Sequence, residues 1–126
     1  MALHHAASNQ SKYTVDVITI LLKYESTVNE KDEEASTPLY LAIYGEAEET
    51  EWTASIVEFL LNHGAYVDEK DEVGYIALHR ATWKQSRYTV DVMKIIVKHG
   101  SNVNETDGFG MKVLHLAADV EVEITE

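Results

Sequence analysis

One segment of about twenty residues occurs three times in this chain, and this repetition limits the possible folds more than any other feature. The copies read SKYTVDVITILLKYESTVNEKD (residues 11–32), EWTASIVEFLLNHGAYVDEKD (51–71) and SRYTVDVMKIIVKHGSNVNETD (86–107). A shorter piece precedes each copy, as ALHHAAS (2–8), TPLYLAI (37–43) and IALHRAT (76–82), and a fourth, VLHLAAD, occupies residues 113–119. Leu3, Leu39, Leu78 and Leu114 mark the period, at intervals of 36, 39 and 36 residues. Units of this kind are predicted to stack, because none can bury its apolar face alone.

Each unit is predicted to contain two short helices followed by a projecting arm. In the longer segments apolar residues cover a wide arc of the helix, which indicates a helix packed between neighbours. Thr14, Thr53 and Thr89 are predicted N-caps of this second helix, with hydroxyls that accept from a free backbone N–H. Gly64 and Gly100 follow it, at the position where a left-handed residue commonly ends a helix.

The pieces TPLYLA (37–42), ALHRA (77–81), VLHLAA (113–118), LLNHGAYVDEKD (60–71) and IVKHGSNVNETD (96–107) resemble the ankyrin repeat family. The resemblance covers nearly the whole chain. It implies an all-α repeat solenoid, an ankyrin-like stack of helix–loop–helix units with projecting β-hairpin arms. In this register the chain holds a partial unit at 1–31, units at 32–70 and 71–106, and a partial unit at 107–126. The resemblance also implies that histidines in one column of the repeat form hydrogen bonds to adjacent arms.

The chain departs from the family pattern at several positions. The units exceed the usual period of about 33 residues, and the additional residues fall between the two helices. Tyr40 replaces the usual histidine, and Ala35 replaces the usual glycine of the arm. Glu25 stands where later units have glycine. Because a side chain in a left-handed cap costs about 1 kcal/mol, Glu25→Gly is predicted to raise the melting temperature.

The net charge of −12 restricts the classes of partner. Acidic residues gather in EKDEE (30–34), EAEETE (46–51) and DEKDE (68–72). A surface of this sign repels phosphate backbones and anionic lipid headgroups, so neither a nucleic acid nor a membrane is the expected partner. The clusters are either solvated loops or a surface that attracts a basic partner. The chain has no cysteine, which is compatible with a cytoplasmic or nuclear location.

No pattern of catalytic or metal-binding residues stands out. His4, His79 and His115 occupy one repeat column, roughly 10 Å apart if helices pack at their usual spacing, which is too far to share an ion. The tripeptide GFG (108–110) lacks the context of a phosphate-binding loop. We therefore expect no enzyme activity, no cofactor and no metal.

The resemblance implies a protein–protein interaction module that binds its partner through a concave face and the tips of the arms. By register, the candidate partner-binding residues are Ser8, Asn9, Glu33, Glu34, Ser36, Tyr44, Glu72, Val73, Tyr75, Trp83, Lys84, Phe109 and Met111. Large apolar residues among them, at positions expected to be exposed, have the composition of a binding hot spot, unless they pack against one another across adjacent units. The neighbouring acids favour a partner protein with an apolar anchor and a basic rim.

Other functions stay open. The units are an architectural segment of a longer array, or they form a homo-oligomer through uncapped ends. Alternatively they are a regulatory segment attached to an enzyme. The long inserts are also similar to those of ankyrin proteins of large DNA viruses, some of which act as host-range factors, so a viral host-interaction factor is a further alternative.

Overall fold

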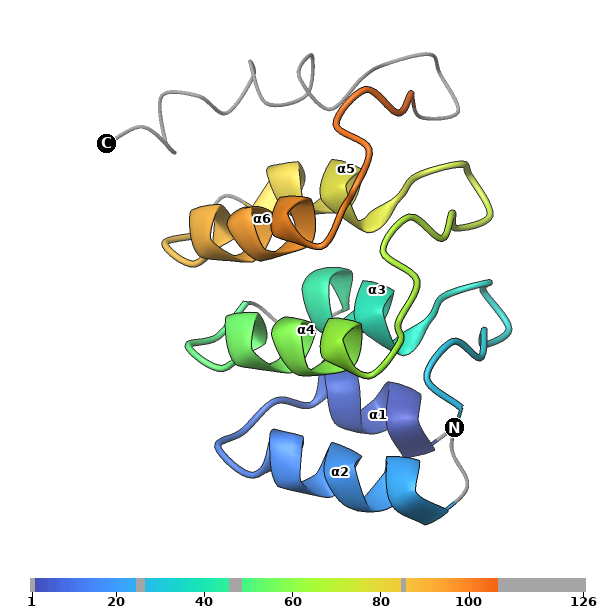
Figure 1. Ribbon diagram of the computed structural model, residues 1–126, viewed down its shortest axis with the longest axis vertical. Coiled ribbons are helices and arrows are strands. Elements are labelled where there is room, and N and C mark those ends of the chain that lie inside the picture. The colour runs from blue at the N-terminus through green and yellow to red at the C-terminus, as the bar shows by residue number, and fades with distance from the viewer. Residues whose placement is uncertain (1, 25–26, 46–48, 85, 107–126) are drawn as a thin grey trace.

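The computed structural model describes residues 2–24, 27–45, 49–84 and 86–106 of the chain. These residues form helices in consecutive pairs that stack one above the other (Figure 1). The first pair is α1 (Ala2–Ser8) and α2 (Thr14–Tyr24), the second is α3 (Pro38–Tyr44) and α4 (Thr53–Asn62), and the third is α5 (Ala77–Lys84) and α6 (Thr89–Lys98). This arrangement confirms the predicted all-α repeat solenoid.

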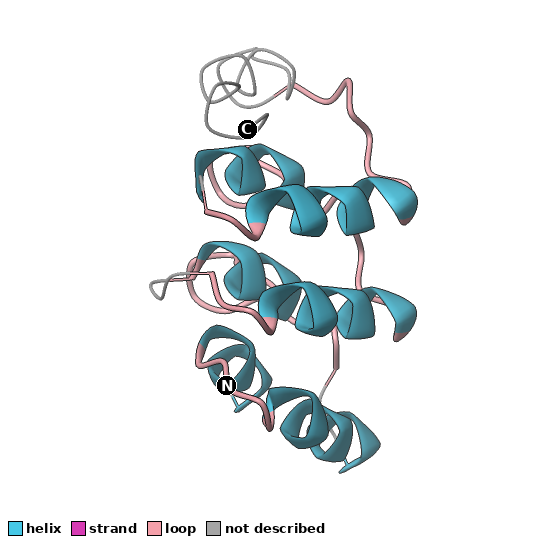
Figure 2. Ribbon diagram, turned by 90° about the vertical axis from the view of Figure 1, so that its left-hand side faces the viewer, coloured by secondary structure: helices cyan, strands magenta, loops and turns pink. Residues whose placement is uncertain are grey.

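The helices form two layers, with α1, α3 and α5 in one and α2, α4 and α6 in the other (Figure 2). Each short helix contacts the next short helix, each long helix contacts the next long helix, and the two helices of a pair contact each other. Leu3, Leu39 and Leu78 are at most 2% exposed, so these three of the leucines that mark the period lie in one continuous core. Ile18, Val57 and Ile96 join this core from the second layer. Stacking therefore buries the apolar arc that the sequence predicted.

The long helices start differently from the prediction. The hydroxyls of Thr14, Thr53 and Thr89 do not cap their own helices: they accept from the N–H of Ser11, Thr50 and Ser86, three residues earlier. The hydroxyls of Ser11, Thr50 and Ser86 accept in turn from the N–H two residues later. This reciprocal pair of bonds is a capping box with threonine in the role usually taken by glutamate. The cap therefore lies one turn earlier than predicted.

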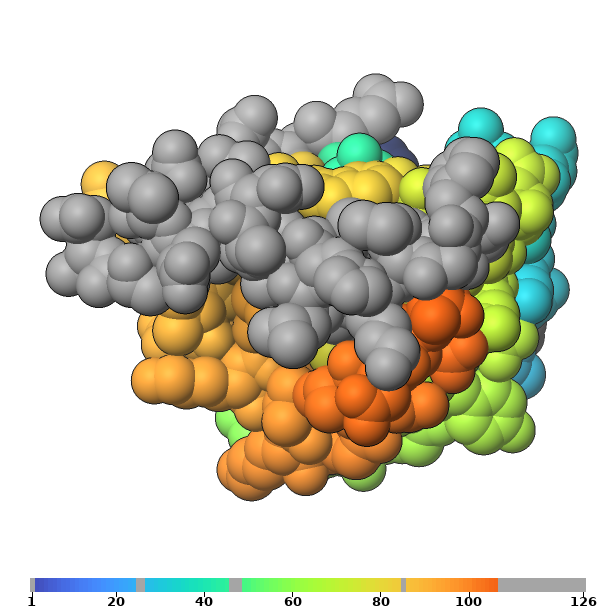
Figure 3. Space-filling view, turned by 90° about the horizontal axis from the view of Figure 1, so that it is seen from above, coloured from blue at the N-terminus to red at the C-terminus, as the bar shows by residue number. Residues whose placement is uncertain are grey.

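The arms that follow α2 and α4 are tight turns held by an aspartate. Asp32 Oδ1 accepts from the N–H of Glu34 and of Ser36, both at 2.9 Å. Asp71 Oδ1 accepts in the same way two and four residues later. Within the described residues these arms contain no β-strand, so they project as turns rather than as strand pairs. They lie on one side of the stack, coloured cyan and yellow-green in Figure 3.

Backbone conformation agrees with the predicted role of glycine. Gly64 and Gly100 have φ of 95° and 96°, and their N–H groups bond within the last turn of α4 and α6. Gly74 has φ of 91° at the tip of its arm, and Ala35 takes φ of 61° at the equivalent tip. Ala35 is therefore a residue with a side chain in the left-handed region. Glu25, the subject of the stability prediction above, lies outside the described residues.

Residues of the inserts tie each pair of helices to the next. Gln10 Oε1 accepts from the hydroxyls of Thr50 and Thr53 at 2.7 and 2.6 Å, and its Nε2 donates to the carbonyl of Ala42. Glu49 Oε1 accepts from the hydroxyls of Ser86 and Thr89. Gln10 and Glu49 each stand directly before the capping box of their own unit, and each bonds to the capping box of the following unit. The inserts therefore hold the units in register.

Candidate functional site

A groove of about 280 Å³ lies between α3 and the tips of two arms. It is lined by Glu34, Ser36, Tyr40, Leu41, Tyr44, Gly45, Asp71 and Glu72. Helix α3 is fixed at its start by Thr37, whose hydroxyl accepts from the N–H of Tyr40, and by Pro38 in the first turn. This fixed start turns Tyr40 and Tyr44, which are one helical turn apart, toward the same face. The groove therefore has an aromatic floor with carboxylates at its edge.

Asp71 is the most highly bonded side chain of the site. Its Oδ1 holds the arm, while its Oδ2 accepts from the hydroxyl of Tyr40 at 2.6 Å. The same Oδ2 accepts from Nη2 and Nε of Arg80 at 3.1 and 3.3 Å. Because the Asp71 side chain is only 4% exposed and that of Arg80 15%, this ion pair is largely shielded from water. Asp71 consequently joins an arm, α3 and α5.

The guanidinium group of Arg80 lies among four aromatic rings. Its central carbon is 4.2 Å from the ring centroid of Tyr75, 4.6 Å from Tyr44, 4.8 Å from Trp83 and 5.9 Å from Tyr40. Each ring face attracts a cation by its quadrupole, and the attraction increases where water is excluded. We call Asp71, Arg80 and these four aromatic residues the Arg80 cluster. Three of its members, Tyr40, Tyr44 and Asp71, line the groove.

The ionisation of the Arg80 cluster follows from its contacts. Burial raises the pKa of Tyr40, and the hydrogen bond to the Asp71 carboxylate raises it further. Burial opposes the ionised form of Asp71, but the hydrogen bonds from Tyr40, the Tyr75 N–H and Arg80 outweigh it and lower the pKa. Burial likewise opposes the charge on Arg80, and Asp71 more than compensates, so the pKa is raised. The cluster is therefore a neutral tyrosine beside a charged pair at neutral pH.

The structure brings together part of the predicted partner-binding set. Glu34, Ser36, Tyr44 and Glu72 line the groove. Trp83 and Lys84 adjoin it, because the Trp83 ring lies 6.3 Å from that of Tyr44 and Lys84 Nζ lies 5.2 Å from the Tyr44 ring centroid. Glu33 and Val73 are exposed on the arms, Ser8 is half-buried and Asn9 exposed, and Phe109 and Met111 lie outside the described residues.

The expected exposure of two residues is wrong. Tyr75 is only 7% exposed, because the rings of Tyr75 and Trp83 meet edge to face at 4.9 Å and the Arg80 guanidinium covers the Tyr75 ring. Ser36 is 6% exposed, because its N–H donates to Asp32 and its carbonyl accepts from Nε2 of His4. Tyr75 therefore packs against its neighbours, as the alternative interpretation of the apolar residues allowed.

Sequence reasoning missed Tyr40, Leu41, Asp71 and Arg80 as parts of the site. Arg80 occupies the register position of His5 and Leu41 in the earlier units, so nothing in the repeat marked it. A signal was present in its surroundings, since aromatic residues stand five positions before it and three positions after it. A single arginine among closely spaced aromatic residues is a pattern of cation–π packing.

Other kinds of site receive no support from the described residues. No group of three or more histidine, aspartate or glutamate side chains among them is placed so that it could hold a metal ion. None of the described helices is long and apolar enough to cross a membrane. Two histidines of the short helices take structural roles by bonding to the arms: Nε2 of His79 donates to the carbonyl of Glu105, and Nε2 of His4 donates to that of Glu30.

Stacked helix pairs with arms on one side define a helical repeat protein, a class in which neighbouring units share one core. Comparison with known families matches the Ankyrin repeat to residues 36–72 and 73–108, which is more than half of the chain. The chain belongs to the ankyrin repeat family. A search of curated proteins finds no match to it. Ankyrin repeats are in general protein–protein interaction modules and are typically non-catalytic.

Proposed function

We propose that this chain is a non-enzymatic module of the cytoplasm or nucleus that binds an extended segment of a partner protein in the groove. The partner inserts a lysine or arginine side chain between Glu34 and Glu72, and an apolar neighbour of that side chain rests on Tyr44. The observation that carries the proposal is the composition of the groove, in which carboxylates rim an aromatic floor. Such a site attracts a cation by charge and by ring quadrupoles together.

The distribution of ion pairs on the arms supports this choice of anchor. Lys31 pairs with Glu69 at 2.8 Å, and Lys70 pairs with Glu105 at 3.0 Å, so these arm lysines are neutralised by the neighbouring arm. Glu34 and Glu72 form no ion pair with any described residue, and both are exposed. They are therefore acids whose charge is available to a partner. Nucleic acids and anionic membranes are disfavoured as ligands for the same electrostatic reason.

The site is also preorganised for binding. The Asp71–Arg80 pair and the surrounding rings fix Tyr40 and Tyr44 from below, and Asp32 and Asp71 fix the two arm tips. A rigid surface loses little conformational entropy when it binds, which leaves more of the contact energy for affinity. The segment that binds can therefore be short.

Selection from a library of random linear peptides, with the full chain immobilised, tests the proposal. We expect enrichment of peptides that hold a lysine or arginine next to an aliphatic or aromatic residue. The double variant Glu34→Lys/Glu72→Lys is expected to raise the Kd of the enriched peptides by about tenfold or more in fluorescence anisotropy. The matched control is Glu51→Lys/Asp91→Lys, which makes the same change of net charge at exposed acids outside the groove.

The comparison between the two double variants decides the outcome. If both raise the Kd equally, long-range charge and not the groove is responsible, and the proposal is wrong. Enrichment of peptides without a basic residue would also contradict it. Circular dichroism of both double variants checks that the helices are intact, as expected because all four acids are exposed.

A further inference from the structure

An apolar stripe on α2 faces away from the rest of the stack. Tyr13, Val17, Ile20 and Tyr24 are 59%, 43%, 58% and 69% exposed, and they make up half of the strongly exposed large apolar residues in the described part of the chain. Their spacing of four, three and four residues places them on one side of the helix. Tyr13 belongs to the helix in this respect, because its carbonyl already accepts from the N–H of Val17.

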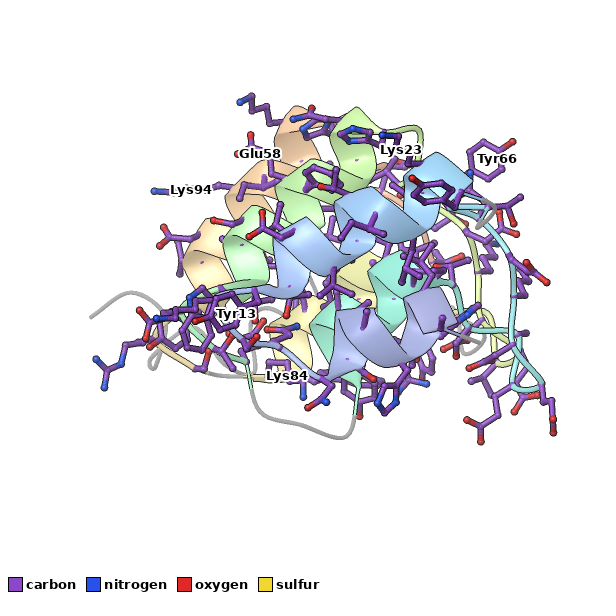
Figure 4. All side chains as sticks on the ribbon, turned by 90° about the horizontal axis from the view of Figure 1, so that it is seen from below. Tyr13, Lys23, Glu58, Tyr66, Lys84 and Lys94 are labelled. Carbon is purple, nitrogen blue, oxygen red and sulfur yellow. The ribbon has the colours of Figure 1, made fainter. Side chains whose placement is uncertain are left out.

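The other two long helices cover the positions equivalent to the two central residues of the stripe. Val17 corresponds to Ile56 of α4 and Val92 of α6, and both of these are fully buried. Ile20 corresponds to Phe59 and Ile95, which pack against the core. Since α2 contacts α4 and α4 contacts α6, this face of a long helix is the one that receives the unit before it. Figure 4 looks onto this face at the α2 end of the stack, where no described element covers it.

The order of residues along the stripe suits a second copy of the same helix. Read in either direction, it runs aromatic, aliphatic, aliphatic, aromatic. A two-fold axis through its middle would place Tyr13 against Tyr24 of the second copy and Val17 against Ile20 of the second copy. A surface that complements itself in this way is the requirement for an isologous dimer contact.

Charge at the edge of the stripe selects the same arrangement. Asp16 and Lys23 are both exposed and stand seven residues apart, so they flank one side of the stripe. Figure 4 shows Tyr13 and Lys23 toward opposite ends of α2. An antiparallel pair of helices would bring Asp16 of each copy to the same side of the contact as Lys23 of the other, whereas a parallel two-fold pair would place the charged flanks of the two copies on opposite sides of the contact. The acidic clusters that carry most of the net charge lie elsewhere, in the arms and the insert.

We propose that two copies of this chain associate through antiparallel α2 helices, with the stripe Tyr13, Val17, Ile20 and Tyr24 as the contact. The dimer leaves the groove between α3 and the arms open, because that groove involves none of these residues. The contact is small, so it forms a weak and reversible dimer rather than an obligate one. Each dimer then presents two grooves, and a partner with two basic segments gains by avidity.

Sedimentation equilibrium of the full chain, from about 5 to about 500 µM, tests the association in the range where small interfaces bind. The expected result is a rise in mean mass toward twice that of the monomer. Ile20→Asp is expected to raise the dimer Kd by about tenfold or more, because it places a charge at the centre of an apolar contact. Val97→Asp is the matched control, since Val97 is 43% exposed on α6, at the other end of the stack.

A charge exchange separates this pairing from other contacts. Asp16→Lys alone and Lys23→Asp alone should each weaken the homodimer, while an equal mixture of the two variant chains should form a heterodimer that native mass spectrometry detects. Mixed dimers no more abundant than either homodimer would overturn the antiparallel arrangement. A monomer at every concentration, or equal effects of Ile20→Asp and Val97→Asp, would overturn the proposal and leave the stripe as a surface for a different protein.

Discussion

The hydroxyl of Tyr40 donates a hydrogen bond of 2.6 Å to the carboxylate of Asp71, which joins α3 to the arm that precedes α5. In the first and third pairs a histidine occupies the position of Tyr40 and donates to a main-chain carbonyl of the following arm. Tyrosine is longer, and it reaches the side chain of Asp71 instead. The substitution that looks like a defect in the repeat thus supplies the floor of the groove and part of the Asp71 site.

We expect Asp71→Asn to lower the free energy of unfolding by about 3 kcal/mol, because it leaves Arg80 as a buried charge without its partner. Asp32→Asn is the matched control. It occupies the equivalent arm and accepts from two N–H groups in the same way, which an asparagine oxygen can also do, so a loss of at most about 0.5 kcal/mol is expected. Urea denaturation followed by circular dichroism measures both. Equal losses would show that the arm turn, and not the Arg80 cluster, depends on the carboxylate.

The difference in the free energy of unfolding between the wild type and Asp71→Asn should depend on pH. The pKa of Asp71 is lowered in the folded state, so its contribution is fully present above the unfolded pKa of about 3.9. That contribution is lost as the pH falls through the folded pKa. The two unfolding free energies should therefore differ by a constant amount above about pH 5 and converge below about pH 4. A difference that already shrinks between neutral pH and pH 5 would contradict this assignment.

Glu49→Gln is expected to stabilise the chain by about 1 kcal/mol at neutral pH. Glu49 is 7% exposed, and its Oε2 is buried without a partner in the described part of the chain, while Gln10 makes the equivalent contacts as a neutral amide. A glutamine at 49 would keep the accepting oxygen and remove the buried charge. The reciprocal variant, Gln10→Glu, should destabilise by a similar amount, because it places a carboxylate against the carbonyl of Ala42. Thermal unfolding measures the stability of both variants. A lower melting temperature for Glu49→Gln than for the wild type would contradict the equivalence of Glu49 and Gln10.

Ala35→Gly is expected to raise the free energy of unfolding by about 0.5 kcal/mol, the net of relieved left-handed strain and greater freedom of the unfolded chain. Ala35 has φ of 61°. Gly100→Ala should have the opposite sign and cost about 1 kcal/mol, through the backbone alone, since a Cβ at Gly100 would meet no atom within 4 Å. Chemical denaturation over a range of denaturant concentrations gives the free energy of unfolding of both variants. If Gly100→Ala were neutral, the left-handed cap would not contribute to stability.

The parts of the fold that follow from periodicity were predictable from the sequence. The spacing of Leu3, Leu39 and Leu78 predicted a shared core, and Gly64 and Gly100 predicted the helix ends, because apolar burial and positive φ each select residue types directly. The helix starts were predicted at the wrong residue, since Ser11 and Thr14 bond to each other and either could be the cap.

The groove was harder to predict because its members meet only through stacking. Tyr40 comes from one unit, while Asp71 and Arg80 come from the next, and no local pattern records that distance. The resemblance located the arms and α3 correctly by register, and four of the candidate residues, Glu34, Ser36, Tyr44 and Glu72, line the groove. It could not indicate that Tyr75 is covered, because that depends on the size of Trp83.

The bond from Gln10 to the hydroxyls of Thr50 and Thr53 has a consequence for how such a chain could lengthen or shorten. A duplication or deletion that spans a whole period keeps a bonding residue ahead of every capping box, wherever the crossover falls. Insertions between the helices keep this arrangement when they fall ahead of the residue that precedes the capping box, as in the second unit, which has three more residues between Leu39 and Glu49 than the first unit has between Leu3 and Gln10. Length variation between units is therefore expected ahead of the residue that precedes each capping box, and not between that residue and the box.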